Sequence, residues 1–325
     1  MSTTLDVEQG ADVKSADAYQ GLIARLSQQS VVKHFDAYAD VAWDAPEMRI
    51  DPEDPRWELS DDNALGRTAW YKSQPQGVRA RIGLHGIVAN MKTGLEFESV
   101  LKRGLLEYAS TLPNGSPEFR YAYHEVIEEA QHSLMFQEFV NRSGIDVPGM
   151  PALMRFSSRQ VVRLGRRFPT LFFMFVLGGE DPIDFVQRQA LRSGQEIHPL
   201  LERIMRIHVT EEARHLSFAR HYLKRNAPKL GWFRRQKLAI RVPFILGTMA
   251  GMMMRPSRQI VRTYKIPRSV LREAFKRDPD ARQYVLDSLR KVRMLAVELG
   301  IITPVSKLLW RAFGIWDEPV ATPAG

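Results

Sequence analysis

The sequence predicts an all-α protein with a four-helix bundle at its core, and three observations support this fold class. Apolar residues recur every three or four positions along several long segments, which is the period of an amphipathic helix. The period-two alternation of a half-buried strand is scarce. Two of the helical segments carry a Glu-x-x-His motif, and such motifs from separate helices meet in the core of a bundle. A chain of 325 residues, 44% of them hydrophobic, is long enough to bury such a core.

The composition restricts the chemistry that the chain can carry. It has no cysteine, which excludes disulfides, zinc–thiolate sites, iron–sulfur clusters and cysteine nucleophiles. Any metal site must therefore use histidine and carboxylate side chains. The N-terminus is polar and acidic and lacks the apolar segment of a secretory signal, so we expect a cytoplasmic protein. The longest apolar runs, 168–179 and 242–254, are shorter than the ~20 residues that cross a bilayer, so we expect buried helices and no transmembrane segment.

The net charge of +9 is unevenly distributed along the chain. Residues 151–277 hold 26 Lys and Arg against 8 Asp and Glu, whereas residues 1–150 are net acidic. A basic region of this kind can meet nucleic acid, an anionic membrane or an acidic substrate. Its arginines are spread along helical segments without a nucleic-acid-binding motif. We therefore interpret most of them as solvated helix faces and expect no nucleic-acid partner.

The N-terminal part is predicted to lie outside the bundle. We expect residues 1–15 to be disordered and an amphipathic helix to run from Ser15 to about Gln29. Prolines interrupt residues 43–76, which we predict to be loop-like. We expect four aromatic side chains to pin this loop onto the bundle rather than to form a substrate lid: Trp43, Trp57, Trp70 and Tyr71.

The first long helix is predicted to begin at about Gln76. Glu98 lies on its apolar stripe, three residues after Leu95 and seven after Met91, whereas Glu96 lies among polar side chains. A carboxylate on a buried helix face is costly unless it is paired or bound to a metal. Glu98 is therefore a candidate metal ligand, and Glu96 is predicted to be a surface residue.

A second helix is predicted from about Pro117 to Arg142, and it carries Glu129 and His132. A basic helix follows, to about Arg167, and we expect it to pack outside the bundle.

The third bundle helix is predicted from Pro169 to about Ser193. Glu180 comes directly after its strongly apolar first half, again a carboxylate next to an apolar run. Gly178 and Gly179 beside it either leave room for a substrate or allow close helix packing.

The fourth bundle helix is predicted from Glu196 to Arg225. Residues i, i+4 and i+7 of a helix share one narrow stripe, and here they are His208, Glu212 and His215. Further helices are expected from Lys229 onward. We predict breaks in them at Pro243, Pro256, Pro267 and Pro304.

The two halves of the bundle repeat one pattern. Glu98 and Glu129 are 31 residues apart, and Glu180 and Glu212 are 32 apart. Each half therefore reads as a helix with a glutamate followed by a helix with Glu-x-x-His, the ligand pattern of ferritin-like di-iron bundles. A single Glu-x-x-His also occurs as an ion pair on a surface helix. Two copies, each with an upstream glutamate on an apolar stripe, favour a metal site.

Some assignments stay open at this point. His208 exceeds the minimal pattern, and we interpret it as an additional nitrogen ligand. Its counterpart in the first half is Glu125, which we interpret as a carboxylate that orients a ligand histidine. Glu128 and Glu211 are alternative ligands, because a spacing of four residues to the histidine is also geometrically possible.

The pattern resembles the arylamine N-oxygenase family of non-haem di-iron enzymes, of the p-aminobenzoate N-oxygenase type, over about residues 80–225. The resemblance implies two bound iron ions, O₂ as co-substrate, a small amine as substrate and an external electron donor. An iron–manganese pair would look the same in the sequence. The residues that carry the resemblance, and that it implies to be the metal ligands, are Glu98, Glu129, His132, Glu180, His208, Glu212 and His215.

The resulting expectation is a single helical di-iron monooxygenase domain over residues 16–315, with its metal-binding bundle at about 78–225 and a flexible tail at 316–325. A homodimer is left open. The alternatives are a ferritin-like ferroxidase, a hydroxylase or desaturase acting on a C–H bond, and a helical scaffold without metal. A radical-generating ribonucleotide reductase subunit is disfavoured, because Phe136 stands where that family usually has a tyrosine.

Overall fold

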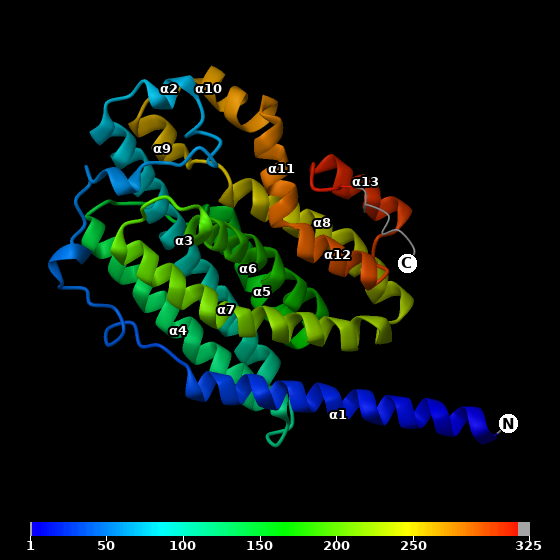
Figure 1. Ribbon diagram of the computed structural model, residues 1–325. Coiled ribbons are helices and arrows are strands. Elements are labelled where there is room, and N and C mark those ends of the chain that lie inside the picture. Colours follow the sequence, from blue (N-terminus) through cyan, green and yellow to red (C-terminus); the bar gives the residue numbers. More distant parts are fainter. Residues whose placement is uncertain (1, 318–325) are drawn as a thin grey trace.

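The computed structural model describes residues 2–317, and within them every regular element is a helix, so the all-α prediction is confirmed (Figure 1). Four long helices form the bundle: α3 (Gln76–Ala109), α4 (Pro117–Ser143), α6 (Pro169–Arg192) and α7 (Pro199–Asn226). α3 packs mainly on α4 and α6 mainly on α7, and the two pairs face each other. The predicted bundle is therefore present, with helix ends close to those expected.

Proline and a capping side chain fix where α4 begins. Ser116 accepts a hydrogen bond from the amide of Phe119, and Pro117 occupies the first turn, where its missing N–H costs nothing. The helix ends at Gly144, whose φ of 64° is left-handed and suits glycine. These local signals hold Glu129 and His132 at a fixed place along the bundle.

The basic helix α5 (Ala152–Arg167) lies outside the bundle against α3 and α6, as predicted. The contact with α3 is backbone to backbone. A Cβ atom at Gly165 would lie 2.0 Å from the carbonyl oxygen of Gly104, so only glycine allows this approach.

The N-terminal helix is longer than predicted. α1 runs from Ser2 to Val32 and packs against α4, so it begins well before the expected start at Ser15. Residues 2–14 contain no proline and a single glycine, so no strong helix breaker separates them from the amphipathic part. The structure thus places a helix where we expected disorder.

The segment between α1 and α3 contains only short helices: η1 (Pro46–Met48), η2 (Pro55–Trp57) and α2 (Ala69–Lys72). Its aromatic side chains anchor it to the bundle, as expected. The buried ring of Trp57 stacks on His198 at 4.1 Å between ring centroids and meets Phe139 edge-on at 6.0 Å. Tyr71 is buried, and its hydroxyl donates a hydrogen bond to the carbonyl of Arg79 at 3.1 Å.

The C-terminal part adds a second layer of helices. These are η3 (Ala227–Lys229), α8 (Trp232–Met253), α9 (Arg258–Thr263), α10 (Arg268–Arg272), η4 (Glu273–Arg277), α11 (Pro279–Ser288), α12 (Arg290–Glu298) and α13 (Pro304–Ala312). α8, α11 and α12 pack on α6, and α13 packs on α8. Trp316 is buried, and residues 318–325 of the predicted tail lie outside the described part of the chain.

One predicted break in this layer is wrong. Pro256, Pro267 and Pro304 do coincide with helix boundaries, but Pro243 lies inside α8. A proline in a helix interior loses one backbone hydrogen bond. The inner face of α8 is buried against the bundle, and we attribute the continuity of the helix to this packing.

One segment of the described chain, Trp232–Thr263, is long and apolar enough by length and composition to cross a membrane. Only 39% of its apolar window is buried inside the protein. Buried core helices pass the same test, so this finding by itself does not indicate a membrane span.

Candidate metal centre

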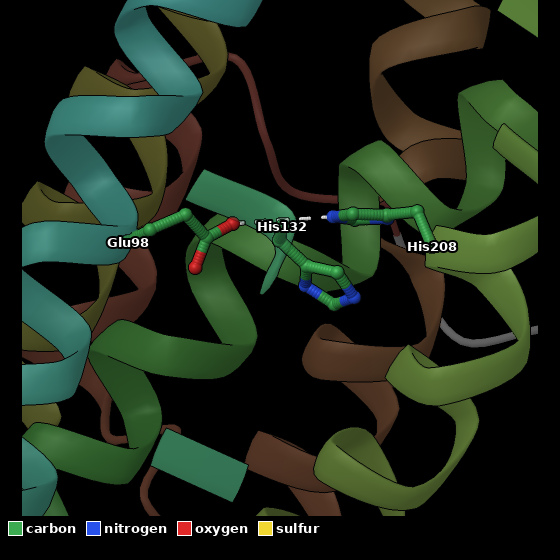
Figure 2. Close-up of side chains that lie close together, drawn as sticks. All are labelled: Glu98, His132 and His208. Atoms are coloured by element: carbon green, nitrogen blue, oxygen red, sulfur yellow. Dashed lines mark ion pairs between the residues drawn. The ribbon is translucent and has the colours of Figure 1, made fainter. Parts of the chain in front are cut away.

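The seven candidate ligands lie together in the interior of the bundle, in two neighbouring groups. In the first group, the ligand atoms of Glu98, His132 and His208 lie within 4.8 Å of one another, and all three side chains are buried. Figure 2 shows these three side chains converging from different helices. The second group is buried and meets the same distance limit; its members are Glu129, Glu180, Glu212 and His215.

All four bundle helices contribute to the site. α3 and α6 each provide one glutamate, Glu98 and Glu180, from a face that is buried in the bundle. α4 and α7 each provide a glutamate and a histidine one turn apart. α7 adds His208 one turn earlier on the same stripe, so helical phase alone explains its place in the site.

Glu212 connects the two groups. Its Oε1 atom lies 3.6 Å from Nδ1 of His132 and 3.6 Å from Nε2 of His208, both of which belong to the first group. Nε2 of His208 lies 3.9 Å from Oε1 of Glu98 on the other side, the contact drawn in Figure 2. The two groups therefore adjoin, and Glu212 lies within reach of the side chains of both.

Unpartnered polar atoms in this interior fit bound cations. Both carboxylate oxygens of Glu180, Oε2 of Glu98 and Oε2 of Glu212 are buried and have no hydrogen-bond partner within residues 2–317. A buried polar atom without a partner is costly, and a buried carboxylate even more so. Carboxylates and imidazoles in this ratio are the donors that divalent iron or manganese prefers. The residues present thus fit a pair of such ions.

The pKa values of these buried groups are shifted by burial and by their charged neighbours. Burial and the charge of Glu129 raise the pKa of Glu98 well above its usual value. Burial and the charge of Glu212 do the same to the pKa of Glu180. Burial lowers the pKa of His208 to about 4, so its imidazole is neutral near pH 7 and free to bind a metal ion.

The two motif histidines are held by carboxylates from the opposite helix. Nε2 of His132 on α4 lies 2.9 Å from Oε2 of Glu211 on α7, and Nε2 of His215 on α7 lies 2.7 Å from Oε2 of Glu128 on α4. This crossed pairing leaves Nδ1 of each ring facing the ligand carboxylates. Carboxylates in this position fix the tautomer and the ring orientation of a metal-binding histidine.

The crossed carboxylates are electrostatically suited to this role. Burial raises the pKa of Glu128, but its hydrogen bond with His215 and the charges of His215 and Arg214 outweigh burial and lower the pKa to about 2. Arg214 donates a hydrogen bond to Oε1 of Glu128 at 2.7 Å. Burial would lower the pKa of His132, but the carboxylates of Glu129 and Glu211 raise it to about 10.

The prediction that Glu125 orients a ligand histidine is wrong. Its carboxylate is fully buried, yet neither oxygen has a hydrogen-bond partner among the described residues. Glu128 and Glu211, which the sequence left as alternative ligands, orient the histidines instead. The tilt between α4 and α7 decides which carboxylate reaches across, and one sequence does not reveal that tilt.

Two residues near the site also bear on the sequence predictions. Glu96 lies outside both groups, as predicted, but it is half-buried rather than on the surface, and it accepts a hydrogen bond from the amide of Met150 at 3.0 Å. Lys102 was missed. Its ammonium group donates to the carbonyl of Glu129 at 3.2 Å and also to Ser133. Its position one turn after Glu98 was the available signal.

The glycines before Glu180 serve close packing. A Cβ atom at Gly179 would lie 2.2 Å from the ring of Phe97, and one at Gly178 would lie 2.8 Å from a methyl group of Leu246 on α8. The space beside Glu180 is therefore filled by neighbouring side chains.

Known proteins are similar to this one over most of the chain. The family model of the P-aminobenzoate N-oxygenase AurF matches residues 16–300. An uncharacterized protein of Mycobacterium tuberculosis (strain CDC 1551 / Oshkosh), MT0908, is 41% identical over 308 residues, which cover 95% of this chain and 91% of that protein. The uncharacterized protein Mb0909 of Mycobacterium bovis (strain ATCC BAA-935 / AF2122/97) is 40% identical over the same length and shares. No solved structure matches the chain significantly.

The match reaches well beyond the bundle on both sides, from within α1 to just after α12. The helical bundle, its repeated Glu-x-x-His motifs and this match agree, and the chain belongs to the p-aminobenzoate N-oxygenase AurF family.

Proposed function

We propose that the protein is a di-iron oxygenase that uses O₂ to oxidise the nitrogen of a small amine. One observation carries the proposal: in a chain of an N-oxygenase family, the seven candidate ligands form two adjoining buried groups. A bound iron pair would supply the electrons that activate O₂, and an external donor is then needed to restore the reduced state.

Each group of residues has a definite part in this proposal. Glu98, His132 and His208 would hold one ion. The second group would hold the other, and Glu212 lies within reach of both. Glu211 and Glu128 would keep the motif imidazoles aimed inward. The buried setting would exclude bulk water from the reacting centre.

The test is to load the metal-free protein with iron(II) without oxygen, count the bound iron, and then add O₂ with and without a panel of aromatic and aliphatic amines. We expect about two irons per chain, a transient optical absorption after O₂ addition, and hydroxylamine or nitro products from at least one amine. Retention of many irons per chain would instead indicate a ferroxidase. Oxidation at carbon with no nitrogen product would assign the site to a hydroxylase or desaturase.

A further inference from the structure

The outer face of α8 carries large apolar side chains that remain about half or more exposed in the described protein. Trp232, Phe233, Ile240 and Phe244 are 67%, 76%, 46% and 62% exposed. Residues 233, 237, 240, 241 and 244 follow helical spacing, so they form one stripe along the helix. Exposed apolar side chains are normal when single, but a continuous stripe marks a surface that binds something.

The same stripe is basic. Lys237 and Arg241 are exposed within it, and neither forms an ion pair with any acidic side chain in residues 2–317. The sequence has no Asp or Glu between Glu212 and Glu273, so α8 and its flanks contribute no negative charge. This excess of positive charge favours an anionic partner for the face.

Neighbouring elements extend the stripe. The ring of Phe244 meets that of Phe313, just after α13, at 5.8 Å, so the apolar surface continues from α8 onto the chain that follows α13. At the other end of α8, the guanidinium of Arg234 lies over the ring of Phe168 at 5.9 Å, next to the basic end of α5.

We propose that this α8 face docks the protein onto an anionic lipid bilayer as a peripheral membrane protein, a role that does not depend on the proposed oxygenase activity. Aromatic side chains settle at the level of the lipid headgroups, and lysine and arginine beside them bind anionic lipids. A nucleic acid would leave the aliphatic and aromatic side chains without apolar contacts. A second copy of this chain would oppose positive charge to positive charge.

The helix lies along the bilayer in this proposal and does not cross it. Its inner face is buried on the bundle through Leu238, Val242 and Leu246, so only the outer stripe is free to enter lipid. Leu246 is also the side chain that packs on Gly178, two residues before Glu180. A single helix would therefore separate the membrane surface from the ligand helix α6.

The proposal is tested by flotation of the full-length protein with vesicles of phosphatidylcholine alone or with added phosphatidylglycerol. We expect binding only when the anionic lipid is present, and weaker binding at high salt because the attraction is screened. Two double variants on the face, Phe233→Ser with Phe244→Ser and Lys237→Glu with Arg241→Glu, should each lower the affinity at least about tenfold.

Matched controls lie on other faces. Ile127→Ser with Leu134→Ser alters two exposed apolar side chains of α4, and Arg25→Glu with Lys33→Glu makes the same charge change on α1 and at the residue just after it. Both control variants should bind anionic vesicles as tightly as the parent protein does. Circular dichroism checks that every variant is folded.

Three results would overturn the proposal. The first is no flotation of the parent protein with anionic vesicles. The second is equal loss of binding in the control variants. The third is a dimer in light scattering that the Phe233→Ser, Phe244→Ser variant converts to a monomer without any vesicle binding, which would assign the face to a second copy.

Discussion

The imidazoles of His132 and His215 each turn Nε2 toward a carboxylate of the opposite helix and Nδ1 toward the candidate ligands. Glu211 also accepts a hydrogen bond from the amide of Phe35, at 3.2 Å, so it ties the chain after α1 to the site. A carboxylate in this place makes the imidazole a stronger donor to a metal ion, because it withdraws the proton from the far nitrogen.

We predict that Glu211→Gln lowers the affinity for iron(II) by about 10- to 100-fold, since the amide keeps the shape but loses the charge that orients and polarises His132. Competition with a coloured chelator under anaerobic conditions measures this. Glu202→Gln is the control, because Glu202 lies on the same helix and, among the described residues, its side chain pairs only with Arg206. Equal affinities in parent and Glu211→Gln proteins would show that the contact is only structural.

Helical phase picked out Glu98 and the stripe of His208, Glu212 and His215 from the sequence, because a stripe on a helix is a local property, whereas Glu180 was chosen for the apolar run before it. Helical phase could not separate Glu125 from Glu128. Both lie on the inner side of α4, and both are buried. Which of them meets His215 depends on how α4 crosses α7, and that is set by packing over the whole bundle.

At the scale of elements, glycine decides how closely the segment before α3 approaches the bundle. A Cβ atom at Gly83 would lie 1.8 Å from the carbonyl oxygen of Trp57, so any larger residue must push η2 away from α3. We predict that Gly83→Ala lowers the free energy of unfolding by about 1–3 kcal/mol, as overpacking of a close contact does.

Gly86→Ala is the matched control for Gly83→Ala, since it lies one turn later on α3 with nothing within 4 Å of the added atom. It should stabilise the protein by about 0.5–1 kcal/mol through helix propensity. Urea unfolding of the two variants compares them directly. A Gly83→Ala protein as stable as Gly86→Ala would mean that η2 is free to move aside.

Tyr71, in the same segment, makes the free energy of unfolding depend on pH. Burial raises the pKa of Tyr71 to about 12, although its hydrogen bond with the amide of Leu59 lowers it in part. The unfolded value is about 10. Between these values the folded state holds a proton that the unfolded state has lost, so stability falls as pH rises from about 10 to about 12.

We predict that Tyr71 contributes about 3 kcal/mol to this alkaline loss of stability, from a shift of about two pH units. Thermal unfolding at a series of pH values measures it. Tyr71→Phe should start less stable at pH 8, because the amide of Leu59 loses its acceptor, but its stability should fall less steeply above pH 10. If the stability of the two proteins falls equally with pH, the Tyr71 hydroxyl ionises in the folded state at the same pH as in the unfolded state.

The elements themselves were largely predictable from the sequence, with two exceptions. Turn residues and apolar periodicity mark the ends of α3, α4 and α6 closely. Pro243 was expected to break a helix and does not, and the first helix starts earlier than its amphipathic part. The residues before the amphipathic part of α1 lack a strong helix breaker, and packing on α6 holds α8 together across its proline.

At the scale of the whole molecule, the bundle surrounds a concentration of negative charge. Four glutamates of the two groups and the two orienting glutamates are all buried at its centre. Histidines, Arg214 and Lys102 offset this charge only in part. The folded state without bound cations therefore keeps carboxylates that repel one another in a poorly solvated interior, and bound cations should stabilise it.

The last prediction follows from this imbalance. Anaerobic addition of iron(II) at about 1,000 times its dissociation constant should raise the free energy of unfolding by about 4 kcal/mol, and chelation should reverse the gain. Glu98→Ala should lose most of this gain while the metal-free variant loses little stability, because burial and Glu129 already disfavour the charged Glu98. Glu96→Ala should keep the gain, since Glu96 contacts Met150 and lies outside both groups.

Calorimetric scans of the three proteins with and without iron(II) make the comparison. If iron(II) shifts the transition of Glu98→Ala as much as that of the parent protein, Glu98 is not a ligand; if it shifts neither, the buried groups do not bind iron in the folded state.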